Sequence, residues 1–207
     1  HKPSWGAARA AGALAARNFL IGLSMIATAF ALLFLATGET SIRAILAGSI
    51  DPAYGIAAAG LLLGGAMTQS AIWPFHRWLI SSLNSPTPVS AIMHAGLVNA
   101  GGFLLARFAP LYFDLPGMLT AVLAAGLVSA VLGTLWKLMQ QDIKRMLACS
   151  TMAQMGFMMV QCGLGLFPAA VAHLCWHGMY KAFLFLNSGG AARDKRLNTQ
   201  GPPGLLA

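Results

Sequence analysis

The ionisable residues His173, His177 and Lys181 recur at four-residue intervals in the last fifth of the sequence. On a helix this spacing places all three on one face. Histidine gains and loses a proton near neutral pH, and a lysine that releases and regains a proton can hand it on. Because ionisable groups inside apolar segments are usually functional, the pattern predicts proton transfer, with Lys181 near the middle of its segment as the central group. The alternative is a lysine that neighbouring carbonyls and hydroxyls satisfy without conduction.

Other polar residues interrupt the remaining apolar segments. His94, followed by Asn99, is a second relay candidate, although a lone histidine also fits a simple helix–helix hydrogen bond. Gln69 is the fifth relay candidate, because it lies beside a predicted helix break. The ion-relay set is therefore His94, His173, His177 and Lys181, with Gln69 at the break.

The secondary candidates have plainer interpretations beside the functional one. Gln154 is typical of hydrogen bonding between membrane helices. Lys137 fits an anchor whose long side chain reaches the membrane surface, and Lys144 with Arg145 fits an interfacial charge cluster. Asn99 and these three side chains, Gln154, Lys137 and Lys144, form the secondary set.

Metal binding and covalent catalysis are not indicated. Cys149, Cys162 and Cys175 form no C-x-x-C pair, and they are expected to pack in the membrane core, with Cys175 off the histidine face. We therefore expect no metal, no cofactor and no covalent chemistry in this chain. The sequence has five acidic residues, all at predicted helix ends or in loops. A buried lysine usually needs a carboxylate partner, so either Lys181 is often neutral or its partner lies elsewhere.

The composition shows what kind of elements must position these groups. Of 207 residues, 57% are hydrophobic and 9% are charged, with a mean hydropathy of +0.70, so the solvent must be lipid. The net charge of +8 is spread over short segments between apolar runs, which does not favour a nucleic-acid surface. The predicted fold is an all-α integral membrane bundle of about six transmembrane helices, one of them discontinuous.

Six segments are long enough to cross a bilayer as helices. They are residues 12–36, 53–80, 88–108, 117–138, 142–163 and 167–190. Residues 1–192 would form the membrane domain, and the charged, Gly- and Pro-rich residues 193–207 would form a cytoplasmic tail or linker. No signal peptide is visible, and we expect the chain to begin within a longer protein.

Basic residues predict the orientation of this bundle. Ten of the thirteen Lys and Arg residues fall on one side and two on the other, Arg43 and Arg107, while Lys181 lies within a span. Positive charge favours the cytoplasmic side, so both ends of the segment should be cytoplasmic in a multi-pass protein of the bacterial inner membrane.

The span at 53–80 is longer than one crossing needs and contains Gly64, Gly65 and Pro74. Proline removes a backbone donor and clashes one turn back, so a break is predicted here. A simple kink and a functional discontinuous helix both fit. At the next span, Thr87 is predicted to N-cap the helix, with Pro88 at its first position.

Four segments carry a family resemblance. They are QSAIWPFHRWL at 69–79, NSPTPVSAIMHAG at 84–96, DIKRMLACSTMAQMG at 142–156, and the histidine–lysine segment at 173–186. Together, and in this order, they resemble the antiporter-like membrane subunits of respiratory complex I and Mrp-type antiporters, over residues 1–192. By this resemblance Lys181 matches the central relay lysine, and His94, His173 and His177 match the histidines near it.

Departures from the family pattern refine the resemblance. Where the family usually reads Gly-Lys-Ser-Ala, this chain has Thr68-Gln69-Ser70-Ala71, so a titrating lysine is replaced by an amide. The family's upstream helix with a buried glutamate and its second broken helix would lie beyond the two ends of this sequence. The 69–79 and 93–102 segments most resemble the DabB subfamily, the membrane subunits of bacterial inorganic-carbon pumps.

That subfamily implies a partner, a DabA-like subunit with a zinc site of the carbonic-anhydrase type, which forms bicarbonate from CO2 while protons or Na+ flow through the membrane subunit. The zinc would belong to the partner. Two alternatives stay open: a subunit of a quinone-reducing or cation/proton antiporter complex, and a non-conducting membrane scaffold for a soluble enzyme.

Overall fold

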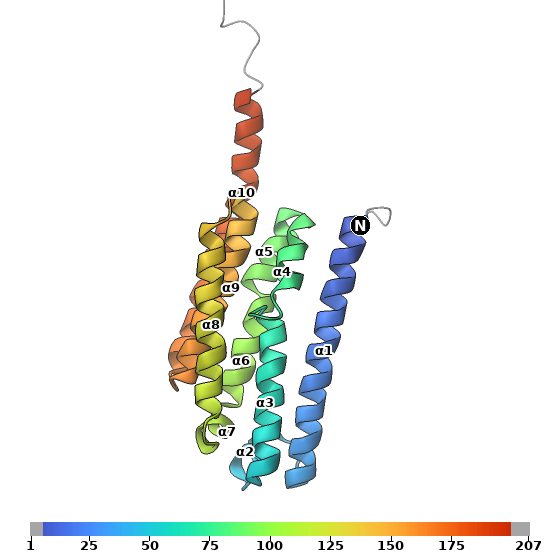
Figure 1. Cartoon of the computed structure of the whole chain (residues 1–207), viewed down its shortest axis with the longest axis vertical. Helices are drawn as coiled ribbons and strands as arrows, with labels where there is room; N and C mark the ends of the chain where they lie inside the picture. Colours follow the sequence, from blue (N-terminus) through green and yellow to red (C-terminus); the bar gives the residue numbers. More distant parts are fainter. Residues whose placement is uncertain (1–5, 200–207) are drawn as a thin grey trace, which may run out of the picture.

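The computed structural model describes residues 6–199, with side chains except those of residues 84 and 189–199. The chain is an elongated helical bundle whose long helices run roughly parallel to its axis (Figure 1). The helices in chain order are α1 (Gly6–Thr37), α2 (Ile42–Ala47), α3 (Pro52–Gln69), α4 (Arg77–Ser81), η1 (Ser82–Asn84), α5 (Thr87–Ala95), η2 (Leu97–Asn99), α6 (Ala100–Arg107), α7 (Ala109–Asp114), α8 (Met118–Leu138), α9 (Ile143–Gly163) and α10 (Phe167–Thr199). The predicted all-α membrane bundle is confirmed.

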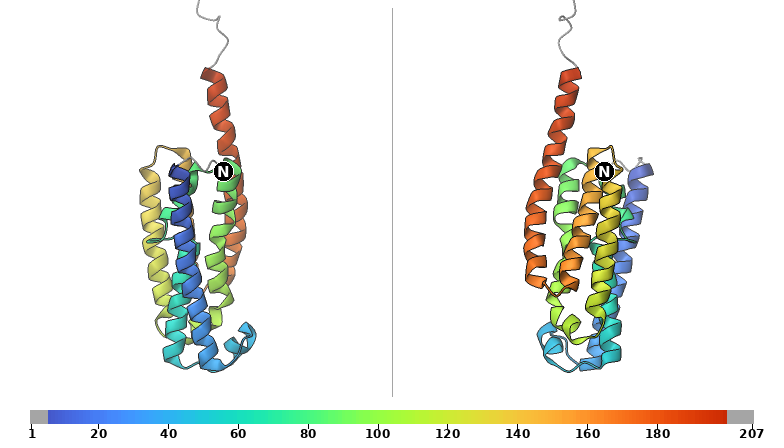
Figure 2. Two further views of the ribbon diagram at one scale, coloured as in Figure 1. Left: turned by 90° about the vertical axis from the view of Figure 1, so that its right-hand side faces the viewer. Right: turned by 60° about the vertical axis from the view of Figure 1, so that its left-hand side comes forward.

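Membrane-spanning character is strongest in three parts of the described chain. The segments Gly6–Thr37, Thr87–Arg107 and Met118–Leu138 are long and apolar enough to cross a bilayer. The other long helices, α3, α9 and α10, lie alongside them (Figure 2). They carry the polar residues Gln69, Gln154 and Lys181, whose groups the bundle must accommodate.

The predicted break in the second span is a true discontinuity. Helix α3 ends at Gln69, irregular backbone follows, and Ala71 has a φ of 52°. The freed carbonyl oxygen of Thr68 accepts hydrogen bonds from Asn18 Nδ2 and Trp78 Nε1, both at 3.0 Å. Ser70 Oγ donates to the Val98 carbonyl at 2.8 Å. The break is stable in lipid because the protein itself satisfies these backbone groups.

The third span differs from its prediction in two ways. Thr87 is not the N-cap: it is the first helical residue, Pro86 takes the cap position, and no side chain caps the helix. The span is also interrupted, because α5 ends before Gly96 and a short 3-10 turn leads into α6. Glycine in a helix interior has a low helix propensity, which favours an interruption there.

Helices α8 and α9 pack very closely through small residues. A Cβ at Gly126 would lie 2.6 Å from the Val160 nitrogen, and one at Gly156 would contact the backbone of Ala130. In lipid, where apolar burial does not drive helix association, this close van der Waals packing holds helices together. This close packing on α8 holds α9, and with it the polar residues of α9, in place.

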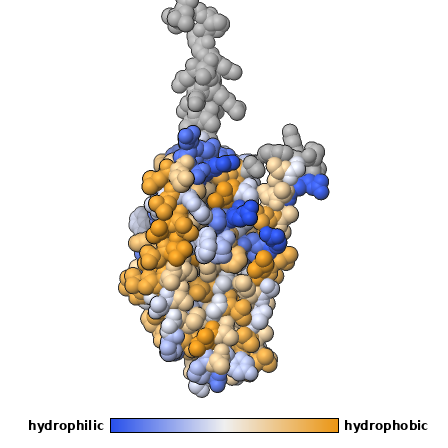
Figure 3. Space-filling view, in the orientation of Figure 1, coloured by the Kyte–Doolittle hydropathy of each residue, from blue (hydrophilic) through white to orange (hydrophobic). Residues whose placement is uncertain are grey.

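The two ends of the bundle differ in charge. The Gly6 end of α1 and the Thr199 end of α10 lie at the same end, at the top of Figure 1, and hydrophilic residues gather there in Figure 3. We call this the basic end; its cations with described side chains are Arg9, Arg17, Arg77, Lys137, Lys144 and Arg145. The opposite end carries Arg43 and Arg107 together with Glu39, Asp51 and Asp114.

Helix α10 is longer than predicted. The sequence predicts an end near residue 190, but the helix continues to Thr199. Residues 191–199 are mostly alanine, arginine, lysine and leucine, which favour helix, so the charged stretch extends the helix beyond the apolar segment. Residues 200–207 of the predicted tail lie outside the described part of the chain.

Candidate functional site

Lys181 is buried where α5, α9 and α10 meet. Its side chain is 1% exposed, and its Nζ donates a hydrogen bond to the Leu147 carbonyl oxygen at 3.2 Å. No aspartate or glutamate is among the buried residues of the described chain, so a main-chain carbonyl takes the place of the carboxylate that a buried lysine usually needs.

Thr151 connects this lysine to His94. Its Oγ1 donates to the same Leu147 oxygen at 3.0 Å and lies 3.3 Å from His94 Nδ1. The Thr151 hydroxyl donates its proton to Leu147, so its oxygen can only accept a hydrogen bond from His94. The His94 ring proton is therefore assigned to Nδ1. The other ring nitrogen, Nε2, is buried without a partner in the described chain.

The remaining histidines extend the polar line along α10. His177 is 5% exposed, and its Nε2 donates to the His94 carbonyl oxygen at 3.2 Å. The ring centroids of His177 and His173 are 6.1 Å apart. His173 Nδ1 lies 3.1 Å from Gln161 Oε1 on α9. The predicted helix face is therefore a set of neighbouring groups, each in contact with or close to the next.

The polar line covers much of the length of the bundle. From Gln161 to Leu147 along α9, the rise of 1.5 Å per residue gives about 21 Å. Leu147 lies in the second turn of α9, so the Lys181 amine is nearer the basic end than the opposite end. Lys181 lies near the middle of α10, as predicted, and its amine reaches toward the basic end.

Asn99 supports this arrangement from η2. Its Nδ2 donates to the Ala95 carbonyl at 2.9 Å and to the Leu174 carbonyl of α10 at 3.3 Å, while its Oδ1 is buried without a partner in the described chain. The side chain thus satisfies a carbonyl near the Gly96 interruption and fixes α10 beside it.

Of the other predicted residues, Lys137 is close enough for its charge to act on the Lys181 amine, and the remaining three lie apart from the line. Gln69 is half-buried against α1, where its Nε2 lies 3.5 Å from the position that a Cβ on Gly22 would take. Gln154 is exposed on α9, so the interhelical contact predicted for it is not made within the described chain. Lys137 is exposed in the last turn of α8, and Lys144 is half-buried in the first turn of α9.

Thr151, Gln161 and the Leu147 carbonyl were not predicted. A threonine in an apolar helix commonly bonds to the carbonyl four residues back, so Thr151 carries no distinctive signal. Gln161 lies at a helix end, where polar residues are ordinary. One feature of the sequence could have pointed to this part of α9. Leu147, Thr151 and Gln154 lie at helical spacing within the family-like segment at 142–156.

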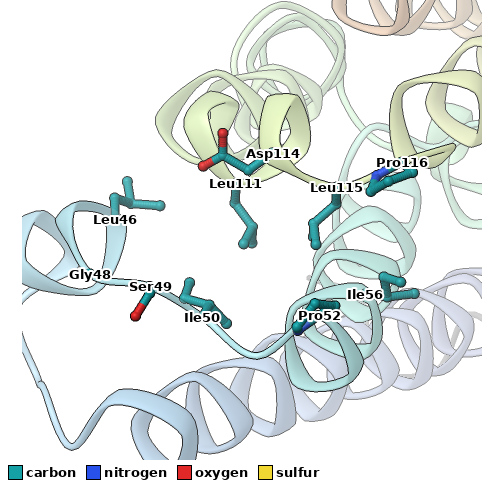
Figure 4. A pocket seen from close by; sticks show the side chains of 10 residues that line it. All are labelled: Leu46, Gly48, Ser49, Ile50, Pro52, Ile56, Leu111, Asp114, Leu115 and Pro116. Atoms are coloured by element: carbon teal, nitrogen blue, oxygen red, sulfur yellow. The ribbon is translucent and has the colours of Figure 1, made fainter.

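The described residues include no group of three His, Cys, Asp or Glu side chains placed to hold a metal ion. Cys149 and Cys162 are buried as expected, and Cys175 is exposed on the surface of the described bundle. It lies off the histidine face, because α9 and α5 cover the opposite side of α10. A cavity of about 550 Å³ lies at the opposite end of the bundle, between the α2–α3 connection and α7, and it contains none of the predicted site residues (Figure 4).

Comparison with known proteins identifies the family. The sequence model described as "NADH:quinone oxidoreductase/Mrp antiporter, TM" matches residues 3–201. The probable inorganic carbon transporter subunit DabB1 of Halothiobacillus neapolitanus is 48% identical over 141 residues, which are 68% of this chain and 25% of that protein. The corresponding DabB subunit of Bacillus subtilis is 40% identical over 201 residues, 95% of this chain and 40% of that protein. The chain thus spans between a quarter and two fifths of these relatives.

Relatives with other names share the same core. Chloroplastic NAD(P)H-quinone oxidoreductase subunit 5 of Brachypodium distachyon is 48% identical over 130 residues, 62% of this chain and 18% of that protein. The Mrp complex from Dietzia sp. DQ12-45-1b contains a chain with a TM-score of 0.84 and 33% identity, covering 89% of this chain and 21% of that one. A membrane-bound sulfane sulfur reductase shares the fold, with a TM-score of 0.80 at 24% identity, covering 89% of this chain and 40% of that one. The expected resemblance is confirmed: the chain belongs to the NADH:quinone oxidoreductase/Mrp antiporter transmembrane family, as an antiporter-like membrane subunit.

Proposed function

We propose that this chain conducts protons along the line of His173, His177, His94, Thr151 and Lys181, and that this flow drives a partner that hydrates CO2. The observation that carries the proposal is the row of neighbouring polar groups, buried or half-buried, from Gln161 to Lys181 along about 21 Å of α9. Buried ionisable groups in a membrane are costly, and a structural role would not require several of them in one line.

The chemistry of the line favours protons over Na+. A hard cation such as Na+ binds best to several oxygen ligands, with carboxylates prominent among them. The titratable groups here are nitrogen bases, and the buried part of the described chain contains no carboxylate. Imidazole can accept a proton on one nitrogen and release it from the other, so a histidine pair can pass protons along a chain.

The inorganic-carbon role rests on the named relatives. Two bacterial relatives, 40% and 48% identical, are named as probable inorganic carbon transporter subunits. A subunit of such a transporter requires partner subunits, and we propose a DabA-like protein that carries zinc and a carbonic-anhydrase-like site. The chain itself would need no cofactor. Its place would be the bacterial inner membrane, with the basic end and both described termini on the cytoplasmic side.

The test is the exchange of Lys181 in the complete protein, co-expressed with its partner in a bacterial host that needs imported inorganic carbon to grow in air. Lys181→Ala removes the amine, and Lys181→Arg keeps a positive charge that cannot be released at physiological pH. Both variants should lose carbon-dependent growth and carbon accumulation while still co-purifying with the partner. Normal accumulation by either variant would contradict the proton relay.

A second function remains a candidate because the chloroplastic quinone oxidoreductase subunit is as identical, 48%, over 62% of this chain. In that case the chain would conduct protons within a redox complex, and purification would recover flavin or iron–sulfur subunits in place of a zinc protein. Gln69, at the position where the family usually has lysine, argues against this assignment. A non-conducting scaffold would instead leave carbon uptake insensitive to uncouplers.

A further inference from the structure

A small apolar cluster lies apart from the main core, next to the polar line. Its buried members are Ala91 of α5, Leu147 of α9 and Phe185 of α10, and Leu83 of η1 and Leu184 of α10 pack against them. The main core, by contrast, is formed largely by α3, α7, the distal part of α9 and the first turns of α10. The five residues therefore join four separate elements at one place.

The cluster lies between the site and the basic end. Leu184 and Phe185 follow Lys181 on α10, which runs toward that end (Figure 1). Ala91 comes one turn before His94 on α5, which runs away from the basic end. Leu83 lies in η1, at the basic end itself, and is partly buried. Leu147 belongs to the second turn of α9, so each member is on the same side of the Lys181 amine.

The cluster directly covers the titratable groups. The Phe185 ring is 0% exposed and stacks on the His94 ring, with centroids 4.4 Å apart and an interplanar angle of 23°. Leu147 contributes its side chain to the cluster and its carbonyl oxygen to the Lys181 hydrogen bond. Water that approached Lys181 through this cluster would therefore pass between carbon atoms.

Water does not occupy such a place readily. A buried water molecule needs two to four polar partners, and apolar constrictions in membrane channels close by excluding water. The five side chains of the cluster offer no polar atom. Three of them, Ala91, Leu147 and Phe185, are buried, and the other two, Leu83 and Leu184, are only partly buried. The apolar layer is therefore thin.

We propose that Leu83, Ala91, Leu147, Leu184 and Phe185 form an apolar gate that keeps the Lys181–His94 pair out of contact with water at the basic end. The proposal rests on the proposed relay, because a gate matters only if the pair exchanges protons. Leu83 is the movable member: it lies in a three-residue 3-10 turn that follows the five-residue helix α4, beyond the break in α3. A shift of this short segment away from Leu147 and Phe185 would open the gate.

The experiment measures water access and does not depend on transport. Thr151→Cys places a thiol at the site in the complete protein, in which Cys149, Cys162 and Cys175 are replaced by alanine. A membrane-impermeant maleimide is applied from the side of the basic end in sealed vesicles. Labelling should be slow with the gate intact and severalfold faster with Phe185→Ala. Leu83→Ser, at a partly buried position of the cluster, should also accelerate labelling. It provides the test if Phe185→Ala does not fold.

The matched control is Phe183→Ala, because Phe183 lies on the same helix, is 63% exposed and is outside the cluster. It should leave the labelling rate unchanged. The gate proposal is wrong if neither Phe185→Ala nor Leu83→Ser changes the labelling rate. It is also wrong if Phe183→Ala accelerates labelling as much as they do. The relay is judged separately from carbon uptake by Lys181→Ala, so the two proposals can fail independently.

Discussion

The Nζ of Lys181 lies 3.2 Å from the main-chain carbonyl oxygen of Leu147, and no carboxylate of the described chain is buried beside it. The acceptor is part of the backbone, so it survives any substitution of the Leu147 side chain. It also receives the hydroxyl proton of Thr151, which makes one oxygen the junction between lysine and histidine. Substitutions of Lys181 and Thr151 therefore probe the junction.

Under the proposed relay, Lys181→Met should abolish proton-coupled carbon uptake without loss of stability. Methionine has a similar length and needs no hydrogen bond, and it removes the cost of burying a charged group that has no charged partner. The midpoint of thermal unfolding of the detergent-purified complex should therefore stay constant or rise while uptake falls to background. A clear fall in the unfolding midpoint would mean that Lys181 has a structural role.

Thr151→Val should impair both stability and uptake. Valine keeps the shape but leaves the His94 Nδ1 proton without an acceptor, which costs about 1–3 kcal/mol for a buried donor. Thr134→Val is the matched control, because Thr134 is exposed and its hydroxyl only bonds back to Ala130 within α8. Thermal unfolding and uptake should be normal in Thr134→Val, and Thr151→Ser should recover uptake. Equal effects at the two positions would remove Thr151 from the relay.

The stripe on α10 was predictable because helical periodicity is a local property. Residues at i, i+4 and i+8 share a face whatever surrounds them, so His173, His177 and Lys181 had to lie together. The helix break was predictable for a similar reason, since Pro74 and the glycines act on the backbone nearby. His94 meets these residues as the family resemblance implied.

The partners of these groups were not predictable in the same way. Thr151 lies 57 residues from His94 in sequence, and Leu147 lies 34 residues from Lys181. Whether a threonine bonds only within its own helix or also to a neighbour depends on how three helices pack. Gln69 shows the reverse case: it lies at the break as expected, but the packing of α3 on α1 turns it toward Gly22 and away from Lys181.

The Thr68 carbonyl at the helix break should behave as a shared acceptor. Asn18→Leu and Trp78→Phe each remove one of its two donors, and each should cost about 1 kcal/mol through the lost hydrogen bond. The double variant leaves the carbonyl unsatisfied in an apolar environment, so its loss should exceed the sum of the two. A double-mutant cycle from unfolding in detergent measures this coupling. Strict additivity would show that water or another group satisfies the carbonyl.

Gly156→Ala should loosen the α8–α9 pair, whereas Gly60→Ala should not. A Cβ at Gly156 would meet the backbone of Ala130, which cannot move aside as a side chain can, so overpacking should cost about 1–3 kcal/mol. Nothing lies within 4 Å of a Cβ at Gly60, inside α3, and alanine there should stabilise the helix by about 0.5–1 kcal/mol. The unfolding midpoints should thus move in opposite directions. Because Thr151 and Leu147 are on α9, Gly156→Ala should also lower uptake; normal uptake with reduced stability would show that the relay tolerates a shifted α9.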